Sequence, residues 1–133
     1  MGTPLSPAAQ AFLKEKVWAH VATLMKNGTP QVTPVWVDTE DGNILINTAY
    51  PRLKARNIER DKRVALSVMG MDDPMRYLSV RGTVKEMRTT TANDDIDRLS
   101  LKYTGNPKYQ GHRDGETRVT VIIEPTHVVE RRL

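Results

Sequence analysis

The chain has 133 residues, no cysteine and a formal net charge of +4. This length suits one domain, residues 1–133, with one hydrophobic core. The lack of cysteine excludes disulfides, thiolate catalysis and thiolate metal sites, and no apolar run is long enough to cross a membrane. The N-terminus has no signal-peptide pattern, so we expect a cytoplasmic protein. The basic excess favours anionic partners, such as nucleic acid or phosphorylated cofactors, without choosing among them.

The first half of the chain predicts one helix followed by three strands. Ser6 and Pro7 are typical of a helix start, and this helix should extend to about Lys16. Strands are expected at residues 17–24, 31–37 and 43–48. Asn27-Gly28 predicts a hairpin between the first two strands, and residues 38–42 predict a second turn. Pro34 inside the second strand indicates an edge strand, a bulge or a place where a ligand meets the backbone.

The second half adds further strands and a second long helix. Strands are expected at residues 64–69, 76–87 and 119–123, with a short further pairing at 126–130, and a helix is expected at 91–103. Gly82 predicts a bend or bulge, Thr91 and Asp94 predict a capping box, and Pro125 should end its strand. The loop at 104–116 is long for a compact domain. Six or so strands with three short helices predict a mainly β, antiparallel barrel.

The most informative stretch, residues 47–63, runs from the end of a buried strand through Pro51 into a short basic helix. At helical spacing Arg52, Arg56 and Arg60 form one row, and Lys54 lies near the first turn. Cations at a helix start oppose the macrodipole, so local stability does not require them. A phosphate held by Arg52, Lys54 and first-turn N–H groups would explain them, and a solvated charged face is the alternative.

The reactive side chains form no recognisable catalytic or metal-binding pattern. His20, His112 and His127 are far apart in the sequence, and Ser67 and Ser79 lack the context of a hydrolase nucleophile. We therefore expect neither a metal site nor catalytic residues of the chain's own. An enzyme of this kind takes its reactive chemistry from a cofactor, and without a GxGxxG motif or P-loop that cofactor must be held in another way. Trp18 and Trp36 are expected to pack in the barrel or in a subunit interface.

Several segments together carry a resemblance to a known family. These segments are PQVTPVWV, INTAYPRLKARNIERDKRVALSV, RYLSVRGTV and KYTGNPKY. In their order they resemble the flavin and deazaflavin oxidoreductase superfamily, which includes pyridoxamine 5′-phosphate oxidase, and most of all its branch of probable coenzyme F420-dependent enzymes. The resemblance covers nearly the whole chain. It implies an FMN-binding split β-barrel of six to seven antiparallel strands with three short helices, assembled as a homodimer with cofactor sites between protomers.

The same resemblance implies a set of cofactor-binding residues. Lys54 matches the lysine that holds the cofactor phosphate, and Arg52 matches a phosphate-contacting position. The whole implied set is Gln31, Thr33, Pro34, Val35, Asn47, Thr48, Arg52, Leu53, Lys54, Asn57, Met75, Arg76 and Tyr77. In this set the last three residues reach the cofactor from the other protomer. Tyr77 departs from the glutamine of the oxidase, and the oxidase's substrate-binding tail has no counterpart, which argues against pyridoxamine phosphate oxidation.

The resemblance favours a reductase that transfers a hydride from reduced coenzyme F420 to a small organic substrate. The surplus of Arg52, Arg56 and Arg60 beyond Lys54 suits the acidic tail of that cofactor. FMN is the alternative cofactor, in an oxidoreductase or a flavin carrier of the same family. A small basic barrel that binds nucleic acid is a more remote alternative, against which stands an aromatic content of only 5%. The sequence leaves the substrate unidentified.

Overall fold

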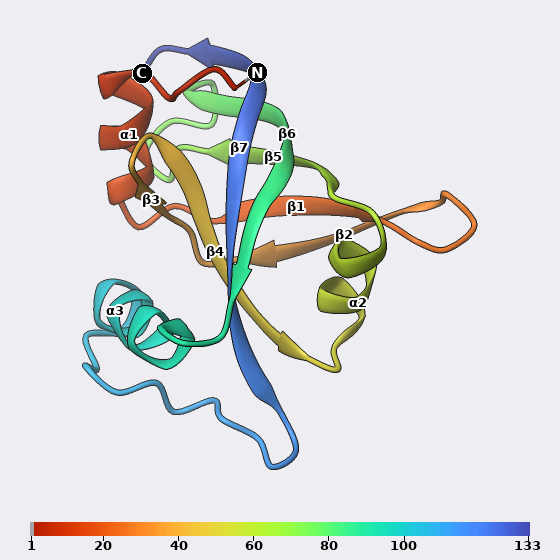
Figure 1. The fold of residues 1–133 in the computed structure, drawn as a ribbon. Coiled ribbons are helices and arrows are strands. Elements are labelled where there is room, and N and C mark those ends of the chain that lie inside the picture. Colours follow the sequence, from red (N-terminus) through yellow and green to blue (C-terminus); the bar gives the residue numbers. More distant parts are fainter. Residues whose placement is uncertain (1) are drawn as a thin grey trace.

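The computed structural model describes residues 2–133, which form one antiparallel sheet and three helices (Figure 1). The helices are α1 Pro7–Lys14, α2 Leu53–Arg60 and α3 Ala92–Thr104. The strands are β1 Ala19–Leu24, β2 Pro30–Val35, β3 Asp38–Glu40, β4 Asn43–Tyr50, β5 Arg63–Met69, β6 Tyr77–Arg88 and β7 Thr117–Arg131. The expected mainly β split barrel with three short helices is confirmed. None of the described helices is long and apolar enough to span a membrane.

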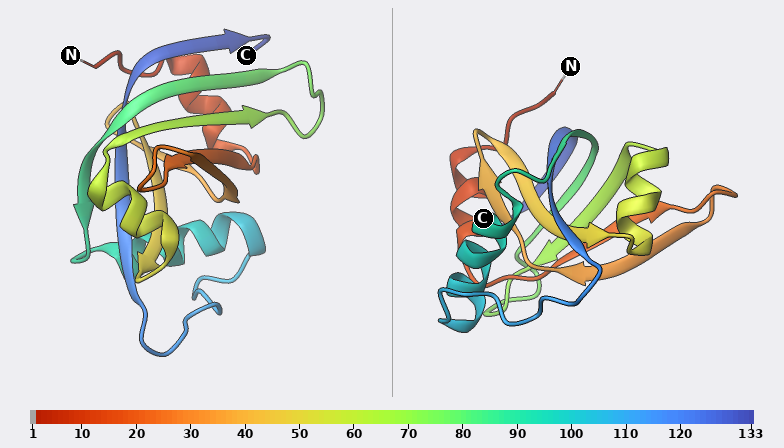
Figure 2. Two further views of the ribbon diagram at one scale, coloured as in Figure 1. Left: turned by 90° about the vertical axis from the view of Figure 1, so that its right-hand side faces the viewer. Right: turned by 60° about the horizontal axis from the view of Figure 1, so that its bottom comes forward.

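The order of strands explains why the barrel is split. The sheet runs β2-β1-β5-β6-β7-β4-β3, and all of its pairings are antiparallel. Its two edge strands, β2 and β3, follow one another in the chain but are not neighbours in the sheet (Figure 2). Pro30 and Pro34 both lie in β2, where an edge strand tolerates the missing N–H donors. The expectation that Pro34 marks an edge is therefore confirmed.

The neighbouring strands β4 and the first half of β7 are buried on both faces. Ile44, Ile46 and Val121 belong to the main core inside the barrel. Leu45 and Ile122 point the other way and form a smaller cluster with Ile96 and Leu99 of α3. Burial on both faces accounts for the continuous apolar runs in these strands, because an alternating pattern requires one solvated face. It also places α3 against the face of β4 and β7 that carries Leu45 and Ile122.

Helix α1 begins and packs as its sequence predicts. The Ser6 hydroxyl accepts a hydrogen bond from the Ala9 N–H at 3.1 Å, and Pro7 occupies the first helical position. Ala9, Phe12 and Leu13 are buried in the main core. Burial of these side chains fixes α1 against the barrel, on the same side as α3 (Figure 1). The helix ends at Lys14, two residues earlier than expected.

Pro125 does not end its strand, contrary to the sequence prediction. Strand β7 continues through it to Arg131, and Pro125 lies opposite Gly82 at a break in the register with β6. A Cβ atom at Gly82 would lie 2.4 Å from the Glu124 carbonyl oxygen, so only glycine allows this close approach. The bulge predicted at Gly82 is confirmed, and the irregular pairing there accommodates a proline that a regular ladder would exclude.

Two further local predictions are wrong. The expected turn at residues 38–42 contains a short strand, β3, which pairs with the start of β4. The capping box of Thr91 and Asp94 is absent, because Thr91 makes no side-chain cap and instead donates to Asp95 Oδ2 at 2.8 Å. The predicted hairpin is present, with Gly28 at a φ of 86°.

Candidate functional site

A pocket of about 380 Å³ lies between β2, the end of β4, the first turn of α2, and α3. The loop that precedes β7 covers part of it. Its walls are formed by Trp18, Gln31, Thr33, Pro34, Val35, Trp36, Asn47, Thr48, Arg52, Leu53, Lys54, Ile96, Leu99, Tyr109 and Arg118. Every site residue predicted between Gln31 and Lys54 is among them. Segments far apart in the sequence are thus brought into one cavity, while their contact with a cofactor stays a prediction.

Lys54 lies in the first turn of α2, on the wall of the pocket. It is half-buried and forms no ion pair with any carboxylate among residues 2–133. Burial lowers the pKa of Lys54, and the nearby charges of Arg52 and Arg118 lower it further. A cation in such a place favours the arrival of an anion, which would restore its ordinary proton affinity.

Arg52 is the N-cap residue of α2, and it already has a charged partner. Its guanidinium donates to both carboxylate oxygens of Glu116, from Nε at 2.6 Å and from Nη2 at 2.8 Å. The hydrogen bonds from Arg52 lower the pKa of Glu116, burial opposes this shift, and the charge of Arg52 adds to it, so Glu116 stays ionised. Arg52, which the sequence pattern assigned to phosphate binding together with Lys54, is therefore already paired with a carboxylate.

Arg118, at the start of β7, is a pocket residue that the sequence pattern did not reveal. It is 6% exposed, and its Nε donates to Asn47 Oδ1 at 3.0 Å. Its guanidinium lies over the ring of Tyr109, 5.1 Å from the centroid. Arg118 Nη1 and Thr33 Oγ1 are the buried side-chain polar atoms of residues 2–133 that have no hydrogen-bond partner. Both residues line the pocket, where a ligand could supply the missing partners.

An aromatic wall, Trp18, Trp36, Tyr103 and Tyr109, closes one side of the pocket region. Trp36 stacks on Tyr103 with ring centroids 5.2 Å apart, and it meets Tyr109 edge-on at 5.8 Å. Trp18 and Trp36 are 6.4 Å apart. Both tryptophans line the pocket and lie outside the main core of the barrel, while their expected place at a subunit interface stays a prediction. A flat conjugated ring would find favourable stacking and edge contacts here.

Asn57 does not face the pocket, contrary to the site prediction. It is 1% exposed, and its side-chain amide donates to Thr23 Oγ1 at 3.1 Å and to Met25 Sδ at 3.4 Å. The Asn57 Oδ1 atom accepts from Arg60 at 2.8 Å. These bonds join α2 to the β1 hairpin, so the amide serves the fold, because it must be satisfied when it is buried.

Met75, Arg76 and Tyr77 lie at the junction between β5 and β6 and do not line the pocket of their own chain. The Arg76 guanidinium instead pairs with Glu15 and lies over the Phe12 ring. Their expected contact with a cofactor requires a second protomer. That contact stays a prediction.

The matching family model is described as pyridoxamine 5′-phosphate oxidase, and it covers residues 5–130. The protein belongs to the pyridoxamine 5′-phosphate oxidase family. No curated protein matches the chain. Among solved structures, an F420 reductase is 30% identical with a TM-score of 0.80, over 90% of this chain and 94% of that one.

Two more distant structures share the fold of the family. Rv2991, a conserved hypothetical protein of Mycobacterium tuberculosis, is 24% identical, with a TM-score of 0.71 over 93% of this chain and 82% of its own. The heme storage protein HutZ of Vibrio cholerae is 14% identical, with a TM-score of 0.67 over 97% of this chain and 96% of its own. At these identities the likeness concerns the fold alone, so it does not carry over what those proteins bind.

The chemistry of the pocket fits the kind of cofactor that this family suggests. Lys54, Arg52 and Arg118 contribute three positive charges and Glu116 one negative charge, which leaves +2 at one end of the pocket. Among the residues that line it there is no carboxylate, histidine or cysteine. A planar, anionic cofactor would meet aromatic rings, unpaired donors and cations, and it would supply the reactive atoms that the walls lack.

Proposed function

We propose that the protein is a coenzyme F420-dependent reductase. The observation that carries this proposal is the pocket itself, with an unpaired lysine in the first turn of α2 and a net charge of +2. Support comes from the F420 reductase that shares 30% identity over 90% of the chain. When bound, the reduced deazaflavin supplies a hydride, and an electrophilic carbon of a small organic substrate accepts it.

In this proposal the residues of the chain bind the cofactor and orient it. Lys54 and the first-turn N–H groups of α2 hold the phosphate, since an N-terminal turn with a cation is a ready anion site. Thr33, whose hydroxyl is buried without a partner, would donate a hydrogen bond to the cofactor. Trp18 and Trp36 exclude water from one side of the ring system. Such positioning would let the reacting carbons approach to about 3–3.5 Å, which is the main task of a site without its own acid or base.

A homodimer is part of the proposal, with the sites between protomers. Val32, Met69 and Val129 are apolar and exposed on the sheet, at 57%, 49% and 41%. An apolar sheet face of this kind favours a second copy of the chain. In that arrangement Met75, Arg76 and Tyr77 of one protomer approach the pocket of the other.

FMN remains the alternative cofactor, because its phosphate would suit Lys54 equally well. The preference for F420 rests on the relative and on the acidic tail of that cofactor, which a basic surface would attract. The protein would then serve as an FMN-dependent oxidoreductase or a flavin carrier.

The decisive experiment is titration of the purified cofactor-free protein with F420 and, in parallel, with FMN. Quenching of the fluorescence of Trp18 and Trp36 reports binding, and the absorption of each cofactor gives an independent readout. We expect saturable F420 binding that is tighter than FMN binding. Tighter FMN binding would favour the alternative, and binding of neither cofactor would refute both.

A further inference from the structure

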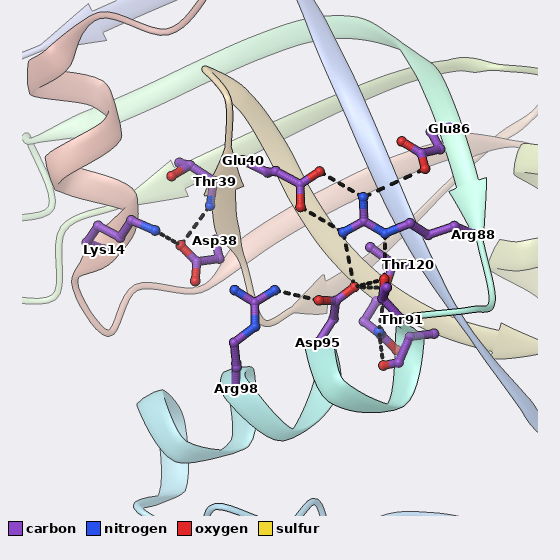
Figure 3. A network of polar contacts seen from close by, with 12 residues as sticks. Lys14, Asp38, Thr39, Glu40, Glu86, Arg88, Thr91, Asp95, Arg98 and Thr120 are labelled. Carbon is purple, nitrogen blue, oxygen red and sulfur yellow. Dashed lines mark hydrogen bonds and ion pairs between the residues drawn. The ribbon is translucent and has the colours of Figure 1, made fainter.

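Among residues 2–133, the buried charged residues are Asp95 and Arg118. Their side chains differ greatly in how many hydrogen-bonding and charged partners they have. Figure 3 shows Asp95 surrounded by donors. The Asp95 carboxylate accepts from Arg88, Arg98, Thr91 and Thr120, at 3.2, 2.5, 2.8 and 2.6 Å. Arg118 makes one side-chain hydrogen bond, to the amide of Asn47, and no ion pair with a described carboxylate. A buried cation left in this state costs stability, so its presence calls for a reason outside the fold.

A chain of hydrogen bonds joins these two residues and determines how Arg118 is held. Thr120 Oγ1 donates its single hydrogen to Asp95, because an ionised carboxylate only accepts. The Thr120 oxygen must therefore accept from the Asn47 amide nitrogen, at 3.2 Å. The second amide hydrogen goes to the Ala92 carbonyl at 3.0 Å, so Asn47 Oδ1 is directed to Arg118 Nε. Asp95 thus orients the Arg118 guanidinium through Thr120 and Asn47.

This orientation leaves Arg118 Nη1 buried and without a partner at the wall of the pocket. The ring of Tyr109 lies against one face of the guanidinium, which restricts its movement. Lys54 is near enough for the charge of Arg118 to lower the pKa of Lys54, after the larger effect of burial. Arg52, in contrast, already forms an ion pair with Glu116. Two unpaired cations, Lys54 and Arg118, therefore share one end of the pocket.

We infer that Arg118 is the second phosphate-binding cation of the pocket, beside Lys54, in the role that the sequence pattern assigned to Arg52. This inference rests on the proposed function, since it places the phosphate of the proposed cofactor. Arg118 Nη1 donates to a phosphate oxygen that Lys54 does not take. Two adjacent unpaired cations suit a phosphate group with close to two negative charges, or a phosphodiester with a neighbouring carboxylate. Asn47, Thr120 and Asp95 are positioning residues for this contact.

The test compares two matched variants, Arg118→Met and Arg52→Met, each of which removes one cation from the pocket wall. The affinity for F420 and for FMN is measured by tryptophan fluorescence, and the melting temperature of the cofactor-free protein is measured in parallel. We expect Arg118→Met to weaken binding at least about tenfold, as loss of a charge-assisted hydrogen bond does. Arg52→Met should weaken binding less.

The melting temperature separates a binding role from a structural one. Arg118→Met should change it little, because removal of a buried unpaired charge offsets the loss of the hydrogen bond to Asn47. Arg52→Met should lower it, because the Glu116 ion pair is lost. A lowered melting temperature with unchanged affinity in Arg118→Met would overturn the inference, as would a larger loss of affinity in Arg52→Met. If Arg118→Met does not fold, Arg118→Lys replaces it, and unchanged affinity there has the same meaning.

Two further measurements complete the design. Asn47→Leu keeps the charge of Arg118 but removes its orienting bond, and should also weaken binding severalfold.

If neither F420 nor FMN binds to the wild type, the proposed cofactor is wrong, and the titration is repeated with inorganic pyrophosphate by calorimetry. Pyrophosphate binding that is lost in Arg118→Met would still support the phosphate site. Equal binding by both proteins, or no binding to the wild type, would overturn it.

Discussion

The guanidinium of Arg52 and the carboxylate of Glu116 form a two-point ion pair, with donor–acceptor distances of 2.6 and 2.8 Å. This pair joins the N-cap of α2 to the last residue of the loop 105–116. The loop has no strand or helix of its own, and it carries Tyr109 to the wall of the pocket. Arg52 therefore holds part of the pocket wall in place, and its contact with a phosphate stays a prediction.

Glu116→Gln should release this loop and leave the pocket one positive charge richer. We expect affinity for an anionic cofactor to rise severalfold at low salt, and the rise to shrink at high salt. Trypsin should cleave the loop faster at Lys108 or Arg113, because the anchoring ion pair is gone. Limited proteolysis and fluorescence titration measure the two effects.

Asp114→Asn is the control for Glu116→Gln, because Asp114 is an exposed residue of the same loop without an ion pair to any described side chain. It removes the same charge and should change neither cleavage nor affinity by more than about twofold. Equal effects of the two variants would show that the net charge of the loop, and not the Arg52–Glu116 ion pair, determines the rate of cleavage and the cofactor affinity.

Lys54→Ala should weaken cofactor binding about tenfold to hundredfold, which corresponds to about 1.5–3 kcal/mol for a charge-assisted hydrogen bond. The cofactor-free protein should not lose stability, because Lys54 has no ion pair and lies in a first turn where a cation is unfavourable. The rate at saturating cofactor should stay nearly constant. Fluorescence titration, thermal melting and steady-state kinetics measure these three quantities.

Arg56→Ala is the matched control on the same helix. Arg56 is exposed and does not line the pocket. Arg60 is less suitable, because it donates to the Leu24 carbonyl at 2.9 Å and so contributes to the fold. Similar losses in Lys54→Ala and Arg56→Ala would indicate a diffuse basic surface in place of a phosphate site.

Asp95→Asn should destabilise the protein by about 3–5 kcal/mol, because it leaves buried donors around a side chain that has lost its charge. Arg88 would keep its bonds to Glu40 at 2.8 and 2.7 Å, whereas asparagine offers one oxygen in place of the two that accept from Thr120 and Arg98 (Figure 3). A fall in the melting temperature of roughly 10 °C or more is expected. Differential scanning calorimetry measures it.

Asp94→Asn controls for the loss of a negative charge in the first turn of α3. Asp94 is exposed, so its replacement should change the free energy of unfolding by no more than about 0.5 kcal/mol. If Asp95→Asn is equally mild, the network around Asp95 contributes little, and the positioning of Arg118 has another origin.

The sequence predicted those parts of the fold and the site whose signal is local. The Asn27-Gly28 turn, the Ser6 cap and the bulge at Gly82 each follow from the conformations that one or two residues allow. Lys54 could be proposed because a cation in a first turn is itself unusual, and the resemblance to a family then gave it a role.

The rest of the site depends on contacts that no local pattern encodes. Glu116 is 64 positions from Arg52, and the Arg118–Asn47 bond spans 71 positions. Tyr109 lies in a loop without periodicity, so its approach to the pocket depends on how α3 and the loop pack against the sheet. For the same reason the inward orientation of Asn57, toward the β1 hairpin, could not be read from its place in a basic helix.

Lys102 should make stability depend on pH in a defined window. Its ammonium donates to the carbonyls of Leu13 at 2.6 Å and Val37 at 2.7 Å, and burial lowers the pKa of Lys102 from 10.5 to about 8. Asp38 opposes this shift. Between pH 8 and 10.5 the unfolded chain holds a proton that the folded protein has released, so stability should rise with pH there.

Lys102→Met should abolish that rise, whatever its effect on stability near neutral pH. Melting temperatures are compared with those of the wild type up to about pH 9.5, because burial raises the pKa of Tyr103 to about 12 and reverses the trend in more alkaline solution. Lys85→Met, at an exposed position of β6, should keep the wild-type slope. A wild-type slope in Lys102→Met would show that Lys102 is not the group that titrates.

The proposed homodimer predicts a specific result for Val32→Glu. Val32 is 57% exposed on the edge strand β2, and a carboxylate at this position should oppose burial between two protomers. Sedimentation should show a dimer for the wild type at micromolar concentration and a monomer for Val32→Glu. Cofactor affinity should fall in parallel, since Met75, Arg76 and Tyr77 would no longer reach the pocket of a partner.

Leu101→Glu is the matched control, because Leu101 is 54% exposed on α3, outside the sheet, and this variant should stay dimeric. A monomeric wild type, or a monomeric Val32→Glu that binds the cofactor with full affinity, would contradict the shared site.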